Sequence, residues 1–304
     1  MNTSGWPQAL PRPGNQKLQR LESASRWFEI FQVSAGAFAL LESRHYEEVI
    51  SYLIVGDARA VLLDTGMGIG DIRAEVERLT RLPVVVVNSH SHYDHIGGNY
   101  QFADVWSFDD DGEVAYTERG LTPAQCARHL WQGSYLELPP GFDPQAYEIH
   151  PSRVTRRLRH LEAIELGGRT LTVHHTPGHS AGSLCLLDSR DGLLFTGDTY
   201  YPGAMYAHFD DSDFNAYVQS MRYLVGMMDH VSHLCPAHNE AQVPKEALMP
   251  VLDAFERVAA GQVAFEMEDK VRVYRFDGFS VTLPPRPQGF SETLRVSPSR
   301  GDAT

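Results

Sequence analysis

One short run of the sequence concentrates side chains that bind metal ions. The segment NSHSHYDHIGG begins at Asn88 and places His90, His92, Asp94 and His95 within six residues. The three imidazoles would repel one another as cations at low pH, and polar groups of this kind are costly to bury in an apolar core. Imidazole and carboxylate are, however, ligands of zinc. The two glycines that follow let the chain turn tightly around an ion. The spacing therefore predicts a metal site.

Three more candidate ligands follow apolar runs elsewhere in the chain. They are His179 in HTPGHSAGS, Asp198 in LLFTGDT and His238 in LCPAHN. Because the carboxyl ends of strands form one rim of an α/β sheet, we expect these side chains to meet the first cluster. Seven ligands suit two ions with open positions for water. The expected division is His90, His92 and His179 at one ion, Asp94, His95 and His238 at the other, and Asp198 as the bridge. Zinc takes this ligand set, and iron or manganese also accept nitrogen and oxygen ligands.

The elements that position these ligands are visible as hydrophobic patterns. Strands are expected at 49–55, 60–63, 82–87, 170–174, 183–187, 193–196 and 231–235. Helices are expected at 72–79 and from near Ser212 and Glu246. The succession of strand, helix and strand between 60 and 87 indicates the buried sheet of an α/β protein.

The domain organisation follows from the same patterns and from composition. We expect a flexible N-terminal tail over 1–25, a catalytic domain over 26–262 and a C-terminal hairpin and tail over 263–304. An aromatic-rich insertion near 107–153 interrupts the domain and is either a lid over the site or a surface subdomain. The hairpin, if it does not fold back on the core, is a partner surface for a homo-oligomer.

Composition excludes several classes of protein. The 304 residues include 26 Lys and Arg against 39 Asp and Glu, so the net charge of −13 disfavours binding to nucleic acid. No apolar run approaches the roughly 18 residues of a membrane span. The three cysteines, Cys126, Cys185 and Cys235, fit no disulfide framework, and the N-terminus lacks the pattern of a secretory signal. These features favour a cytoplasmic protein.

The ordered ligand motifs together resemble the metallo-β-lactamase superfamily. The resemblance rests on H-x-H-x-D-H at 90–95, the distal His179, the Gly-Asp pair at 197–198 and the last His238. It implies an αββα sandwich, in which helices flank two mixed sheets, with a dinuclear site at the rim between the sheets. Asp64, in VLLDTG, matches an early aspartate of the family that supports the metal loop without binding the metal.

Details within the superfamily narrow the activity. β-Lactamases lack the bridging aspartate found here at Asp198, flavin-linked di-iron members place glutamate where this chain has His92, and nucleases have basic surfaces. Hydrolysis of a small thioester, lactone or ester remains. A closer resemblance, from Trp27 to about Ala259, is to acyl-coenzyme A hydrolases that contain this domain, so an acyl-coenzyme A thioesterase is the first hypothesis. N-acyl homoserine lactonases place a tyrosine at the offset of Tyr201, so a lactonase or another ester hydrolase is the alternative.

The expected mechanism is attack on an acyl carbonyl by a hydroxide that two zinc ions share. Asp94 would both bind metal and orient the hydroxide, and Tyr201 could donate a hydrogen bond to the carbonyl oxygen. The insertion and the segment 200–209 are candidates for the wall of the acyl pocket. Arg153, Arg156, Arg157 and Arg159 either contact the phosphates of coenzyme A or form a solvated face.

Two hypotheses from other classes remain open. Persulfide dioxygenases share the ligand string but use one iron, so metal analysis would separate them from a dizinc hydrolase. A non-enzymatic sensor that retains the metal site is the third hypothesis, and rapid turnover that a chelator abolishes would exclude it.

Overall fold

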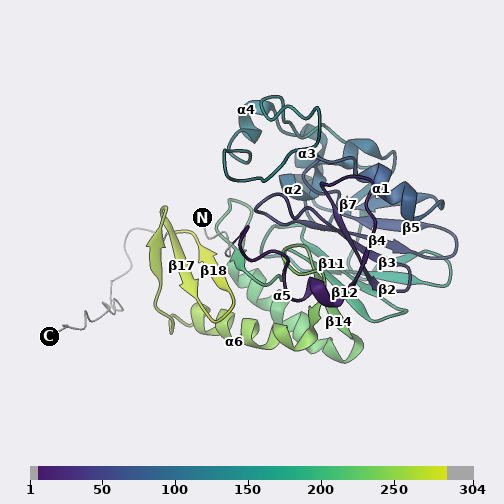
Figure 1. Ribbon diagram of the computed structural model, residues 1–304. Helices are drawn as coiled ribbons and strands as arrows, with labels where there is room; N and C mark the ends of the chain where they lie inside the picture. Colours follow the sequence, from purple (N-terminus) through teal and green to yellow (C-terminus); the bar gives the residue numbers. More distant parts are fainter. Residues whose placement is uncertain (1–5, 286–304) are drawn as a thin grey trace.

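Two large β-sheets form the centre of the computed structural model, which describes residues 6–285 (Figure 1). The first sheet runs in sequence order: β1 (Gln19–Leu21), β2 (Glu29–Ser34), β3 (Ala37–Leu41), β4 (Ile50–Val55), β5 (Ala60–Leu63), β6 (Val84–Val87), β7 (Val105–Phe108) and β8 (Arg156–Leu158). The second runs β15 (Val243–Pro244), β14 (His233–Pro236), β12 (Leu193–Gly197), β11 (Leu184–Asp188), β10 (Thr170–His175) and β9 (Ala163–Glu165). Both sheets are mixed, since β5 to β8 are parallel to one another and β12 is parallel to β14.

Helices cover the outer faces of the two sheets. Their bounds are α1 (Ile72–Leu79), α2 (Tyr93–Ile96), α3 (Asp111–Arg119), α4 (Pro123–Cys126), α5 (Phe214–Gly226) and α6 (Leu248–Ala259), with short 3-10 turns η1 (Asn15–Lys17), η2 (Asn99–Gln101), η3 (Met228–His230) and η4 (Lys245–Ala247). Asp71 and Asp213 cap α1 and α5 by accepting from backbone amides of the first turn. The predicted αββα sandwich is confirmed.

The core between the sheets is apolar and joins them directly. Tyr52 of β4 meets Phe195 of β12 edge-on, with 5.0 Å between ring centroids. The Tyr52 hydroxyl donates to the carbonyls of Pro236 and Ala241, which flank the His238 loop. The sheets are thus tied together next to one of the predicted ligands.

The N-terminal residues differ from the expected flexible tail over 1–25. Trp6 is buried, and its Nε1 donates to a backbone carbonyl of the loop after β3. The amide of Asn15, which is 1% exposed, donates to the Asn239 carbonyl, and its Oδ1 accepts from the Ala241 amide. Composition alone misses these contacts because the partners lie far away in the sequence.

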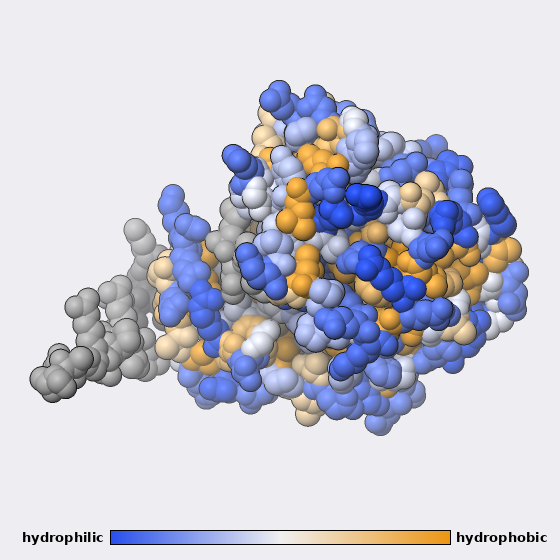
Figure 2. Space-filling view, viewed as in Figure 1, coloured by the Kyte–Doolittle hydropathy of each residue, from blue (hydrophilic) through white to orange (hydrophobic). Residues whose placement is uncertain are grey.

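The C-terminal hairpin folds back on the body of the protein. β17 (Val271–Arg275) and β18 (Ser280–Leu283) pair in a small sheet with β16 (Glu266–Glu268) and with β13 (Ala204–Tyr206), which follows the Asp198 loop. The expected tail from 286 onward lies outside the described residues. In the described part of the chain, no helix is both long and apolar enough to cross a bilayer. Hydrophilic residues form most of the face shown in Figure 2.

Candidate metal centre

The metal-binding motif forms the loop and the short helix that follow β6. His90 precedes α2, His92 is its N-cap, and Asp94 and His95 lie within it. A Cβ at Gly97 would lie 2.2 Å from the Met67 carbonyl carbon, so only glycine allows the loop to pack this closely on the chain after β5. The tight turn expected after the motif is therefore set by packing against a neighbouring loop.

The other predicted ligands converge on this loop from the second sheet. His179 follows β10, Asp198 follows β12 and His238 follows β14, and these three strands point the same way. Ligand atoms within 4.8 Å of one another form three groups: His90, His92 and His179; His90, His95 and Asp198; Asp94, His95 and His238. We call these seven side chains the metal rim. Two of the groups are those that the sequence predicts for two separate ions.

Asp198 lies between these two groups. Its Oδ2 is 3.5 Å from Nε2 of His179, and its Oδ1 is 3.1 Å from Nε2 of His238 and 3.3 Å from Nε2 of His95. The two carboxylate oxygens thus face different halves of the metal rim. This is the placement that a bridging ligand requires.

A hydrogen bond at Nδ1 orients most of the imidazoles. Nδ1 of His179 faces the Tyr206 carbonyl at 2.8 Å, and Nδ1 of His238 faces the Glu47 carbonyl at 2.7 Å. Nδ1 of His95 lies 2.9 Å from Oδ2 of Asp64. Such bonds fix the tautomer and leave Nε2 with a lone pair for a metal ion.

Buried atoms of the metal rim lack hydrogen-bond partners among residues 6–285. They are Nε2 of His90, Nε2 of His95 and Oδ1 of Asp198. Polar atoms buried in this way are costly unless a ligand satisfies them. The donor set and its orphaned atoms therefore fit a metal centre, with nitrogen and oxygen ligands that suit zinc.

Asp64, which the resemblance places in support of the metal loop, contacts that loop. It follows β5 with φ of 61°, and its Oδ1 accepts from the Ser89 amide at 2.7 Å. Its Oδ2 accepts from the Ser89 hydroxyl at 2.7 Å and faces His95. Asp64 thus holds both the start of the loop and one ligand, without contributing to the three ligand groups.

The electrostatics of the two halves of the metal rim differ. Burial lowers the pKa of His179 to about 3 and the pKa of His90 well below its ordinary value. Burial also disfavours the charged forms of His95 and His238, but the surrounding carboxylates outweigh it and raise their pKa values to about 9 and about 10. His90 and His179 thus offer neutral imidazoles, whereas at His95 and His238 protons and metal ions compete for the same nitrogens.

The metal rim opens into a cavity of about 880 Å³. The insertion contributes Tyr116, Arg128 and His129 to its wall, and the segment after Asp198 contributes Tyr201, Tyr206, His208, Phe209, Asp210 and Asp211. Both segments proposed for the wall therefore line it, but the aromatic residues that drew attention to the insertion, Trp131, Tyr135, Phe142 and Tyr147, do not. Tyr147 is instead buried, and its hydroxyl donates to the Met67 carbonyl at 2.7 Å.

Tyr201 lies beside the metal rim with its hydroxyl engaged. Its ring centroid is 4.9 Å from that of His238, and its hydroxyl donates to the Ala204 carbonyl. The hydroxyl must leave that carbonyl before it can donate to a substrate. Its side chain is buried, which agrees with a packing role in the wall of the cavity.

Sequence reasoning missed residues that contact the ligands from other segments. Oδ2 of Asp211 lies 3.8 Å from Nε2 of His92, and Glu47 holds His238 through its carbonyl. Glu113 of α3 accepts from the Ser180 hydroxyl, directly after His179. No spacing to the ligands distinguishes these residues, because they come from neighbouring loops that only the fold brings together.

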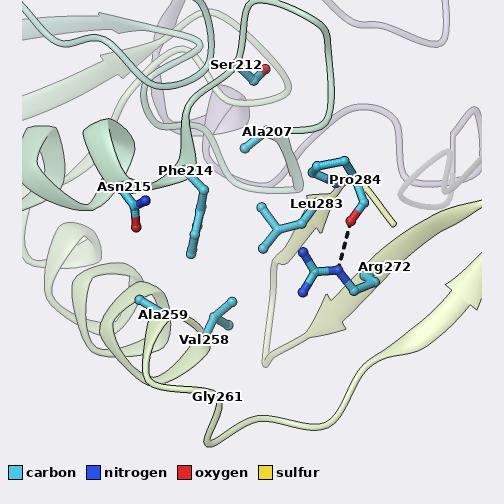
Figure 3. A pocket seen from close by; sticks show the side chains of 10 residues that line it. All are labelled: Ala207, Ser212, Phe214, Asn215, Val258, Ala259, Gly261, Arg272, Leu283 and Pro284. Carbon is cyan, nitrogen blue, oxygen red and sulfur yellow. Dashed lines mark hydrogen bonds between the residues drawn. The ribbon is translucent and has the colours of Figure 1, made fainter. Parts of the chain in front are cut away.

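A second cavity has a volume of about 300 Å³ (Figure 3). Phe214 of α5, Val258 of α6 and Leu283 of β18 line it, and Arg272 donates to the Pro284 carbonyl at its edge. It contains none of the predicted ligands. The larger cavity is therefore the candidate active site.

With the fold and the ligand geometry in place, comparison with known proteins identifies the family. The model of the metallo-beta-lactamase superfamily matches residues 48–238, so the chain belongs to this superfamily. The human "Acyl-coenzyme A thioesterase MBLAC2" is 30% identical over 234 residues, which cover 71% of this chain and 82% of the human protein. The Gallus gallus protein of that name is 31% identical over 231 residues, with the same coverage.

A solved structure supports the fold. The DIM-1 metallo-beta-lactamase is 11% identical with a TM-score of 0.55, and the match covers 78% of this chain and all of the other. At this identity the likeness concerns the fold alone. The family and the thioesterase-named relatives support the prediction that the chain is a hydrolase.

Proposed function

We propose that this protein is a dinuclear zinc hydrolase that cleaves acyl thioesters, with acyl-coenzyme A as its substrate. One observation carries the proposal: two groups of candidate ligands, with Asp198 between them, open into a single cavity of about 880 Å³. The relatives named as thioesterases supply the bond type. The alternative is hydrolysis of a lactone or another carboxylic ester in the same cavity.

The residues of the chain bind and orient the reactants. When bound, the two ions would polarise the carbonyl and lower the pKa of a water molecule toward about 7. Asp94 lines the cavity, and its Oδ2 lies 3.6 Å from Nε2 of both His95 and His238. We assign to Asp94 the role of orienting that water, because its carboxylate can accept a hydrogen bond from it. His90, His92 and His179 hold the other half of the centre.

The test is a matched panel of substrates hydrolysed by the zinc-loaded protein. It comprises acyl-coenzyme A thioesters, acyl homoserine lactones, simple aryl esters and a β-lactam, with Asp198→Ala as the blank. We expect the thioesters to have the highest kcat/KM and the blank to be inactive. If lactones or esters lead instead, the thioesterase assignment is wrong, although the metal chemistry stands.

Metal analysis separates this function from oxygen chemistry. We expect about two zinc ions per chain after purification without added metal. One iron ion per chain together with consumption of oxygen would favour the persulfide dioxygenase alternative. Iron or manganese in a two-to-one ratio with hydrolytic turnover would keep the hydrolase and change only the metal.

A further inference from the structure

Among the described residues, Arg128 is the one lysine or arginine that lines the large cavity. It follows α4 in the insertion and is exposed to solvent. The carboxylates of the same wall, apart from the two in the metal rim, belong to Glu47, Asp110, Glu113, Asp210 and Asp211. Arg128 is thus the one guanidinium or ammonium group in a wall that carries several carboxylates.

Arg128 forms no ion pair with those carboxylates within residues 6–285. Its Nε donates to Nε2 of His129 at 3.0 Å, and this is the one hydrogen bond that the Arg128 side chain makes within the described residues. Several of the carboxylates have other partners: Glu47 accepts from a tyrosine hydroxyl, Asp110 caps α3, and Glu113 accepts from a serine. The Nη groups of the guanidinium therefore remain available to a ligand.

A rigid support holds this arginine. The His129 ring stacks on Tyr93 with 3.6 Å between centroids, and the His129 carbonyl faces Nε2 of His45 at 3.0 Å. Burial and the nearby Arg128 lower the pKa of His129 to about 4, so the ring is neutral at neutral pH and can accept from Arg128. Tyr93 directly precedes Asp94, which couples the support to the metal rim.

Three of the four arginines in the basic cluster considered from sequence are paired with carboxylates. Arg156 pairs with Glu162 at 2.5 Å, Arg157 pairs with Asp109 and Asp111, and Arg159 pairs with Asp109 at 3.6 Å. None of the three lines the cavity. Within the described structure, these arginines form a paired surface, as the solvated-face interpretation expected.

We propose that Arg128 binds an oxyanion of the substrate, a phosphate or a carboxylate that lies several bonds from the scissile carbonyl. The inference rests on the proposed thioesterase function for the identity of the reacting bond. The planar guanidinium presents paired donors that match an oxyanion. Asp210 and Asp211 line the same cavity and disfavour an anion beside them, so the charges also restrict where the oxyanion of the substrate can lie.

Three thioesters with acyl chains of equal length test the proposal. Octanoyl-coenzyme A carries phosphates on the leaving group, S-octanoyl-N-acetylcysteamine carries no charge, and the N-acetylcysteamine monothioester of octanedioic acid carries a carboxylate on the acyl group. In Arg128→Gln we expect KM to rise about tenfold for one charged substrate and to stay unchanged for the neutral one. The affected substrate identifies the source of the oxyanion, and Arg128→Lys should restore part of the loss.

The control is Arg157→Gln, which removes an exposed, paired arginine of the neighbouring surface and should leave all three KM values unchanged. Equal KM values for wild type and Arg128→Gln on both charged substrates would overturn the inference, as would an equal rise for all three. A rise in KM for Arg157→Gln alone would place the oxyanion of the substrate at the basic cluster instead.

Equilibrium binding separates failure of this inference from failure of the proposed function. Free coenzyme A and octanedioate are titrated against the zinc-loaded wild type and Arg128→Gln. A protein that hydrolyses no thioester but binds one anion about tenfold more weakly in the variant loses the thioesterase assignment and keeps the role of Arg128. Equal binding of both anions to both proteins overturns that role, whatever the substrates hydrolysed.

Discussion

The metal rim and the cavity wall are built in different ways. Ligands such as His90, His95 and His179 are at most 1% exposed, follow strands of the two sheets, and have Nδ1 hydrogen bonds that orient their rings. In the wall, Phe209 is 39% exposed, and Arg128 and Asp210 lie on loops. We infer that residues anchored in the core would set the reaction chemistry, whereas surface segments would select the substrate. Loops of this kind can change with little cost to the fold.

The largest effect that this comparison predicts is at the metal rim. Asp94→Ala removes a ligand atom and the group assigned to orient the water, so we expect loss of one metal ion per chain and at least about a thousandfold lower kcat. Metal content and steady-state kinetics measure both. A variant that keeps two metal ions and full turnover would show that Asp94 has neither role.

The next prediction concerns how metal affinity depends on pH, and it contrasts the two halves of the metal rim. Because His95 and His238 have raised pKa values, of about 9 and about 10, a metal ion must displace their protons at neutral pH. Metal affinity there should fall about tenfold per pH unit for each proton displaced as pH drops below those values. In the other half only His92 has a raised pKa, because the effect of Asp211 outweighs that of burial. Metal affinity in that half should therefore depend less steeply on pH.

Zinc affinities measured between pH 6 and 9 with a competing chromophoric chelator test this difference. Two sites with equal slopes would contradict it. The Asp94→Ala variant, which should retain the half that contains His179, assigns the shallower slope.

A smaller effect is expected where the N-terminal segment holds the His238 loop. Asn15→Ala leaves the buried Asn239 carbonyl and Ala241 amide without these partners, so the free energy of unfolding should fall by about 1–3 kcal/mol. Denaturant unfolding measures the change. Gln16→Ala, which alters an exposed neighbour, should stay within about 0.5 kcal/mol of wild type. Equal stability of the two variants would mean that the segment merely lies on the surface.

The smallest effect is expected at Tyr201, which belongs to the wall although it touches the metal rim. Its hydroxyl is bonded to a backbone carbonyl, so Tyr201→Phe should change kcat on thioesters by less than about threefold. The kinetics of the variant on an acyl homoserine lactone give the comparison. A drop of a hundredfold or more in kcat on either substrate would assign the hydroxyl to catalysis.

The same division explains what the sequence could predict. The strands before His90, His179, Asp198 and His238 are apolar runs followed by ligand types, so local pattern is sufficient to propose the ligands. The sandwich follows from the resemblance to the superfamily that these ligands carry. The sequence does not predict β1, β2 and β3 as strands, because it marks their ends weakly and because apolar and polar residues alternate only weakly along them. The contacts of Trp6 and Asn15 reach 37 and 224 residues along the chain, and no local signal encodes them. The side chains of the wall meet only through loop conformation.

The contact between Asn15 and Asn239 also bears on how the protein is made. Domains fold from the N-terminus as they leave the ribosome, yet this segment finds its partners only after nearly the whole sandwich has been synthesised. His238, the last ligand, emerges at the same stage. During translation the nascent chain can therefore present His90, His92 and His179 long before it can assemble the half that contains His238. If each half binds one metal ion, as proposed, the order of synthesis would also set the order in which the two sites become complete.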